Sequence, residues 1–178
     1  KFYRLASLYF LGNGYEHFGI DHYAKKSSSI IQNVKNRKLQ RNFQGYTEDD
    51  AEILIGIGAS SISSLPNGYT QNIARIADYI KVLKKNKLPI SRGYELKTED
   101  KIYSTVIKEL MCYLNVDLKR ITKKFSKDIN LFSSNIKKLK PFIDAGYVDF
   151  QNFVLTIKPE ARPLVRIICS VFDQYFVP

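Results

Sequence analysis

The sequence is poor in the residues that bind metals or form covalent cross-links. Its 178 residues include two cysteines, two histidines, one methionine and no tryptophan. Cys112 and Cys169 are far apart in apolar surroundings, unlike the spacing of a disulfide framework or a metal site. We therefore predict two buried free thiols, a cytoplasmic location, and no zinc or iron-sulfur site held by this chain alone.

Long apolar runs are absent as well. The longest apolar stretch, residues 51–62, is interrupted by Glu52 and by small residues, and it is too short to cross a bilayer as a helix. Lys1 and Arg4 precede an apolar run, but no small-x-small cleavage pattern follows, which argues against a signal peptide. Because the chain starts with Lys inside an expected helix, we interpret it as part of a longer parent protein.

Positive charge is concentrated in one region. The formal net charge is +11, and residues 79–140 hold 16 Lys and Arg against 6 Asp and Glu. Such a field attracts nucleic acid, anionic membrane surfaces or acidic ligands. Lysines make up 20 of the 28 basic residues and are spread around the expected helices. We therefore favour a solvated surface, and neither nucleic acid nor a membrane is the expected partner.

The first part of the chain alternates helix and strand patterns. Residues 3–11 predict a helix that ends at a Gly-Asn-Gly stop, and residues 15–20 predict a strand. Asp21 and His22 follow that strand, where an α/β barrel places its reactive side chains. A turn-forming Asp and a structural His are the alternatives.

A second helix-strand pattern follows. Thr47 is expected to cap a short helix whose first turn begins with Glu48. Residues 53–57 predict a strand, followed by the small residues of 58–63. Small side chains at this point allow either a close approach to a ligand or tight packing against a neighbouring element, and composition does not choose between them.

The remainder is expected to be mainly helical after a turn at residues 66–68, which marks the predicted domain boundary. Pro141 is expected to kink or restart its helix, and residues 147–156 predict two β-prone runs. Helix, hairpin and helix outline a winged helix, so a nucleic-acid-binding module is the alternative function. Helices are expected at residues 71–85, 98–114, 117–125, 129–145 and 160–176.

Four segments, in this order, carry a family resemblance: Gly19–Ala24, Arg41–Thr47, Gly56–Ser63, and Ile168-Cys169 with Phe172-Asp173. Together they resemble the oxygen-independent coproporphyrinogen III oxidases over nearly the whole chain. The second segment, Arg-Asn-Phe-Gln-Gly-Tyr-Thr, is the most specific, because related radical S-adenosylmethionine (SAM) proteins that act as haem chaperones differ there. That haem-chaperone branch is a further alternative.

The resemblance implies an α/β fragment, the C-terminal edge of a radical SAM barrel, in residues 1–68. A mainly α, winged-helix-like domain is implied for residues 69–178. The implied cofactors are S-adenosylmethionine and a 4Fe-4S cluster bound by a CxxxCxxC motif, which this sequence lacks. The implied substrate is coproporphyrinogen III, whose oxidative decarboxylation at two propionates gives protoporphyrinogen IX. The fragment alone is expected to be inactive and to need a missing N-terminal barrel segment as its partner.

The resemblance also implies site residues. Gln44 matches a glutamine near the family's active site. The resemblance also implies two S-adenosylmethionine molecules in the whole enzyme, and Ile62 matches an isoleucine that lies beside the second of them. Ser61, next to Ile62, and the pair Asp21 and His22 are the other expected cofactor-binding residues.

Arg41 is chosen on chemical grounds, because a guanidinium can hold a substrate carboxylate with two parallel hydrogen bonds. A structural salt bridge is its alternative role. Arg41 and Gln44 are thus the catalytic candidates, and Arg41 and Tyr46 the substrate-binding candidates. Aromatic packing would account for Tyr46 without any contact to substrate.

Overall fold

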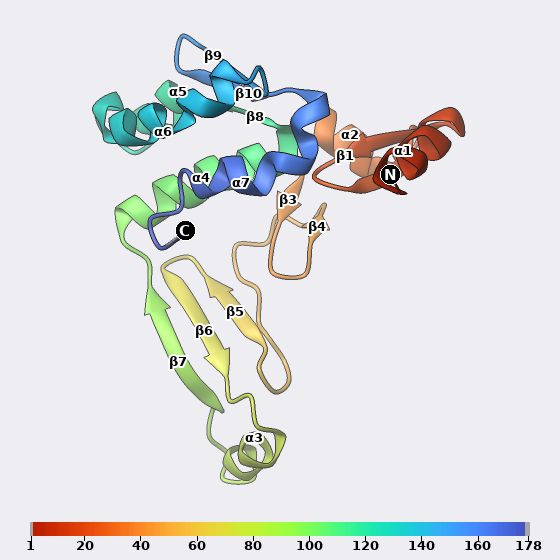
Figure 1. Ribbon diagram of the computed structural model, residues 1–178. Helices are drawn as coiled ribbons and strands as arrows, with labels where there is room; N and C mark the ends of the chain where they lie inside the picture. The colour runs from red at the N-terminus through yellow and green to blue at the C-terminus, as the bar shows by residue number, and fades with distance from the viewer. Residues whose placement is uncertain (1, 177–178) are drawn as a thin grey trace. The chain divides into compact units, whose positions relative to one another are not determined.

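The computed structural model describes residues 2–176, which divide into two compact units (Figure 1). The first unit combines the chain up to Asp49 with the chain from Ile102 onward. The second unit is the intervening segment, Asp50–Lys101. The domain boundary predicted after residue 68 falls inside the second unit, so the observed units follow a different division of the chain.

An aromatic-rich helix and hairpin open the first unit. They are α1 (Phe2–Gly12), β1 (Tyr15–Phe18) and β2 (His22–Lys25). The two strands pair antiparallel, with Phe18 opposite His22. The predicted helix is confirmed, and the predicted strand is confirmed as far as Phe18. Because the chain folds straight back, Asp21 lies in a hairpin turn and His22 begins the returning strand, which corrects the expected placement at the end of a barrel strand.

A short helix and a two-residue hairpin complete this part: α2 (Ser29–Lys35), β3 (Gln40–Arg41) and β4 (Tyr46–Thr47). Its small core contains Phe18, Ile31, Leu39 and Cys112. The helix predicted after Thr47 is wrong. Thr47 ends a strand, and its hydroxyl accepts a hydrogen bond from the Asp49 N–H at 3.1 Å, which satisfies that donor in a turn instead of a helix.

The rest of the first unit is built of short helices around a three-stranded sheet whose order is β8-β10-β9. The expected helices at 98–114 and 117–125 are confirmed. The elements are α4 (Thr98–Tyr113), whose residues up to Lys101 fall in the second unit, β8 (Asn115–Asp117), α5 (Leu118–Lys124), the 3-10 helix η1 (Ile129–Phe132), α6 (Ser133–Asp144), β9 (Val148–Gln151), β10 (Val154–Ile157), the 3-10 helix η2 (Pro159–Leu164) and α7 (Val165–Ser170).

Several boundaries in this part differ from prediction. The expected helix at 129–145 starts as the 3-10 turn η1, and α6 then runs on through Pro141 for a further turn. The expected hairpin is confirmed, with Asn152 and Phe153 in its turn at positive φ. The final helix, predicted for 160–176, is shorter at both ends: a 3-10 turn containing Pro163 precedes α7, and α7 ends at Ser170.

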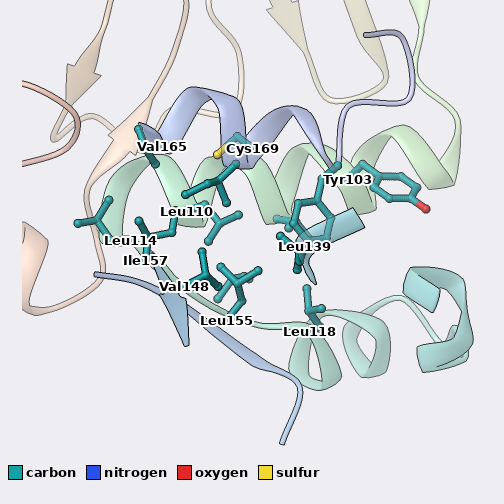
Figure 2. Packing of buried hydrophobic residues seen from close by; sticks show 14 of the residues in the cluster. Tyr103, Leu110, Leu114, Leu118, Leu139, Val148, Leu155, Ile157, Val165 and Cys169 are labelled. Atoms are coloured by element: carbon teal, nitrogen blue, oxygen red, sulfur yellow. The ribbon is translucent and has the colours of Figure 1, made fainter. Parts of the chain in front are cut away.

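The main hydrophobic core lies between α4, α7 and this sheet (Figure 2). Leu110 of α4, Leu155 of β10 and Ile168 of α7 are fully buried there. Burial of side chains of this size stabilises the fold by about 1.5–3 kcal/mol each. Cys112 and Cys169 are buried free thiols, as predicted, and burial raises the pKa of Cys112 to about 11 and that of Cys169 to about 12.

The second unit is an antiparallel sheet of order β5-β6-β7 with one helix in the connection from β6 to β7 (Figure 1). Its elements are β5 (Ile62–Leu65), β6 (Gly68–Asn72), α3 (Ile76–Leu83) and β7 (Ile90–Glu95). The helix predicted from residue 71 therefore starts later, at Ile76. The strand predicted at 53–57 is reduced to a single bridge between Leu54 and Ser64.

Buried side chains of the second unit are mostly polar. Among the described residues of 50–101, Ser63, Asn72 and Asp100 are buried, and Pro89 is the one aliphatic side chain buried with them. The Asn72 amide donates to the carbonyl oxygens of Gly56 at 3.0 Å and Gly58 at 2.9 Å. As for membranes, none of the helices between residues 2 and 176 has the length and apolarity needed to span a bilayer.

Candidate functional site

The turn between β1 and β2 is held by side chains from three other places in the first unit. The Ile20 N–H donates to the Tyr46 hydroxyl at 3.0 Å, and the Ile20 carbonyl lies 3.2 Å from His17 Nε2. The Gly19 carbonyl accepts a hydrogen bond from Arg162 Nη1 at 2.5 Å. The carbonyls of Gly19 and Ile20 and the N–H of Ile20 therefore all have side chains as hydrogen-bond partners.

Tyr46 has a positioning role in this arrangement. Besides accepting from Ile20, its hydroxyl donates to the Met111 carbonyl of α4 at 2.9 Å. Burial raises the pKa of Tyr46, and the neighbouring Arg41 opposes that rise. The ring also fills the space beside Gly19, where an added Cβ would lie 2.3 Å from Tyr46 Cζ. Direct contact of Tyr46 with substrate stays a prediction.

Asp21 and His22 form a pair at the surface of the first unit. Asp21 Oδ1 lies 2.9 Å from His22 Nδ1, and the two side chains are 60% and 49% exposed. The His22 ring meets the Tyr46 ring edge-on, with centroids 4.9 Å apart. Because Nδ1 faces the carboxylate, Nε2 is the ring atom left for a ligand or solvent.

Arg41 pairs with Tyr46 in the β3-β4 hairpin. Its guanidinium carbon is 5.5 Å from the centroid of the Tyr46 ring. Arg41 Nε is buried without a hydrogen-bond partner among the described residues, and none of their carboxylates forms a salt bridge with Arg41. The structural salt bridge is therefore not observed, and a buried N–H without an acceptor is what an anionic ligand would satisfy.

Gln44 lies at the tip of the same hairpin. Asn42 shapes this loop, because its side-chain oxygen accepts from the N–H groups of Gln44 at 2.9 Å and Gly45 at 3.2 Å. The Gln44 side chain is exposed and makes no hydrogen bond with the described residues. Its amide is therefore free to contact a ligand.

Ser61 and Ile62 belong to the second unit, whereas the other predicted site residues belong to the first. The Ser61 hydroxyl donates to the Ile57 carbonyl at 2.8 Å and so stabilises its own loop. Gly56 approaches the Ile62 backbone so closely that an added Cβ would lie 2.7 Å from the Ile62 oxygen. This contact favours tight packing as the reason for a small residue at position 56. Ligand binding by Ser61 and Ile62 stays a prediction.

The described residues do not supply an iron-sulfur site. Between residues 2 and 176 there is no group of three or more His, Cys, Asp or Glu side chains placed to hold a metal ion. Both cysteines are buried, and burial raises their thiol pKa, whereas cluster ligands are thiolates. The 4Fe-4S cluster implied by the family resemblance does not fit these residues, and no chemical step is derived through it.

Two residues of this region were not predicted from the sequence. His17 and Arg162 contact the Gly19–Ile20 turn, but neither occurs in a recognisable motif. Arg162 is 143 positions from Gly19. No local pattern reports a contact over that separation, although Arg162 does lie a few residues before the fourth family-like segment.

Three known proteins that are similar to this chain share one description. The chain is 38% identical over 178 residues to the oxygen-independent coproporphyrinogen III oxidase of Cereibacter sphaeroides, a match that covers 98% of the chain and 38% of that protein. The corresponding proteins of Bradyrhizobium diazoefficiens and Helicobacter pylori are 34% and 36% identical, over 93% and 90% of the chain and 37% and 35% of those proteins. No protein-family model matches the chain.

A solved structure agrees with these relatives. Coproporphyrinogen III oxidase from Escherichia coli, described as a radical SAM enzyme, superposes with a TM-score of 0.92 at 29% identity, and the match covers 97% of the chain and 40% of that protein. The chain thus spans about two fifths of the length of the proteins that it matches. Along nearly all of its own length it is a relative of the oxygen-independent coproporphyrinogen III oxidases, matching their C-terminal region.

Proposed function

We propose that the chain is the C-terminal part of an oxygen-independent coproporphyrinogen III oxidase. The assembled enzyme decarboxylates two propionates of coproporphyrinogen III to vinyl groups in porphyrin synthesis, in the cytoplasm. The observation that carries the proposal is the 38% identity across 98% of the chain, together with the TM-score of 0.92. Because the chain spans only about two fifths of its relatives, the activity is proposed for the chain together with the barrel segment of the whole enzyme.

Within that enzyme, this chain supplies ligand contacts. Arg41 binds a propionate carboxylate through its guanidinium, and Gln44 contacts the reacting ligands from the tip of the hairpin. The contacts to S-adenosylmethionine proposed for this chain are Asp21 and His22 in the first unit and, independently, Ser61 and Ile62 in the second. The 4Fe-4S cluster would be held by residues outside this chain; with S-adenosylmethionine it would supply the radical that takes a hydrogen atom from the propionate, and a separate electron acceptor would take the second electron as carbon dioxide leaves.

The described topology supports a winged-helix-like C-terminal part. The order α4, β8, α5, α6, β9, β10, with the sheet order β8-β10-β9, is the order of helices and strands in a winged helix. Winged helices often bind DNA, but the proteins that match this chain are oxidases. We therefore propose a structural role for this part, and residues 1–68 remain the proposed edge of a barrel.

A chimaeric enzyme tests the proposal. The matching C-terminal part of the Cereibacter sphaeroides oxidase would be replaced by this chain, and vinyl products would be measured under anaerobic conditions with S-adenosylmethionine and substrate. We expect activity from the chimaera and none from the chain alone. A soluble chimaera with its cluster intact but without product would contradict the proposal.

Matched variants test the site within this chimaera. Loss of a charge-assisted hydrogen bond of about 1.5–3 kcal/mol predicts roughly a 10- to 100-fold lower kcat/KM for Arg41→Met. Gln44→Ala should also lower it. The controls are Arg166→Met and Gln32→Ala, which change exposed residues of the same types. Equal kcat/KM in the Arg41 and Gln44 variants and their controls would remove these two residues from the site.

A further inference from the structure

The Gly19–Ile20 turn is fixed by more contacts than a hairpin turn needs. Gly19 has φ of +56° and is packed against the Tyr46 ring, so a side chain at this position would be strained and would overlap Tyr46. Three side chains, from β1, β4 and η2, then bind its backbone groups. Asp21 and His22 follow directly, and both are exposed.

Arg162 is the charged member of these three. Its side chain is half-buried, and it has no carboxylate partner among the described residues. Burial lowers the pKa of Arg162, while Tyr3, Tyr23 and Tyr46 oppose that change. A partly desolvated guanidinium without a counter-ion is costly for stability. Its favourable contact is the hydrogen bond to the Gly19 carbonyl, which points to a local role for this side chain.

We propose that Arg162 is a positioning residue, which reaches from η2 to the Gly19 carbonyl and holds the turn that presents Asp21 and His22 to the reacting ligands. The inference rests on the proposed function. It links the C-terminal segment η2 to the part of the site carried by the first hairpin. Arg162 acts through the backbone and is not itself required to touch substrate.

The test compares Arg162→Met, Arg162→Lys and Arg166→Met in the chimaera. The readout is the number of vinyl groups formed per S-adenosylmethionine consumed, because misplaced ligands uncouple the two, whereas loss of folded enzyme lowers both equally. We expect this ratio to fall about tenfold in Arg162→Met, since one charge-assisted hydrogen bond is lost. Arg162→Lys keeps one donor and should recover part of the ratio.

Arg166→Met is the matched control, because Arg166 is exposed and has no salt bridge with the described residues. It should leave the ratio unchanged. A ratio in Arg162→Met equal to that of Arg166→Met would overturn the inference, even if both rates fell together. An unsubstituted chimaera that makes no vinyl product would instead count against the proposed function.

Hydrogen exchange of the 178-residue chain decides the inference independently of activity. The Ile20 amide, which donates to Tyr46, should exchange roughly tenfold faster in Arg162→Met than in the unsubstituted chain. The Leu155 amide in the main core serves as the reference, because its rate reports global unfolding. Unchanged Ile20 exchange, or an equal rise at Leu155, would show that Arg162 does not hold the turn.

Discussion

His17 shows how the surroundings of one residue set its protonation. Burial, with a further contribution from Arg162, lowers the pKa of His17 from 6.5 to about 4. The Ile20 carbonyl can only accept a hydrogen bond, so Nε2 carries the proton of the neutral ring. The ring stacks on Tyr23 with centroids 4.3 Å apart. The folded chain therefore keeps His17 neutral at physiological pH.

This protonation state predicts a pH dependence of stability. Below pH about 6.5 the unfolded chain takes up a proton at His17, whereas the folded chain does so only near pH 4. The free energy of unfolding should therefore fall as the pH drops from about 6.5 to about 4, and His17→Gln should weaken this fall. Urea unfolding at a series of pH values measures it. An identical pH profile in His17→Gln would show that His17 does not cause the loss, and His22→Gln is the control.

The single residues of the site were recognised unevenly from the sequence. Arg41, Gln44 and Tyr46 stand within seven positions of each other, so one motif revealed all three. The structure adds that Arg41 has a buried N–H without a partner and that the Tyr46 hydroxyl is used twice within the protein. A sequence motif shows which residue types are present, but it does not show which hydrogen bonds they form.

At the level of elements, the β1-β2 hairpin depends on the lack of a side chain at Gly19. An alanine there would combine a left-handed backbone with an overlap against Tyr46. Gly14 is a matched control, because its φ is +81° and no atom lies within 4 Å of an added Cβ. Comparing alanine substitutions at these two positions therefore separates the cost of the left-handed backbone from the cost of the overlap with Tyr46.

We predict that Gly14→Ala costs about 1–2 kcal/mol of stability, the cost of a left-handed alanine. Gly19→Ala should cost about 1–3 kcal/mol more, because the overlap forces Tyr46 to move. Urea unfolding of the two variants, followed by circular dichroism, measures both. Equal losses would mean that Tyr46 yields without cost and that the contact does not define the turn.

Local patterns predicted helices better than strands. Apolar spacing on α4 places Ile102, Val106 and Leu110 on one buried face, and Asp117 caps α5 by accepting from the Arg120 N–H at 2.9 Å. These signals lie within a few residues of the chain. Strand β7 was missed, because its pairing partner β6 lies about 20 residues earlier in the sequence and its residues are exposed.

On the scale of the whole molecule, the two units differ in what stabilises them. Apart from Pro89, the first contains every buried aliphatic and aromatic side chain among the described residues, including Phe132 and Phe172. The second relies on sheet pairing and on the Asn72 hydrogen bonds. Ile53, Ile57 and Leu88 of the second unit are 53%, 87% and 79% exposed.

This difference predicts that the second unit opens first. Segments with few buried apolar contacts unfold locally at low free-energy cost. Thermolysin, which cuts beside apolar residues, should therefore cleave the 178-residue chain first within 50–101, at a denaturant concentration that leaves the first unit intact. Mass spectrometry of the early fragments locates the cuts. First cuts within residues 102–176 would contradict the prediction.

The sequence by itself determined the family resemblance, the free thiols and most helices of the first unit, because each of these depends on residue types at short spacing. Tertiary structure alone decided that Asp21 lies in a hairpin turn, that Arg162 reaches the Gly19 carbonyl, and that residues 50–101 form a unit in which Pro89 is the one buried apolar side chain. Those features depend on pairing and burial between distant segments, and such energies are set only when the whole chain has folded.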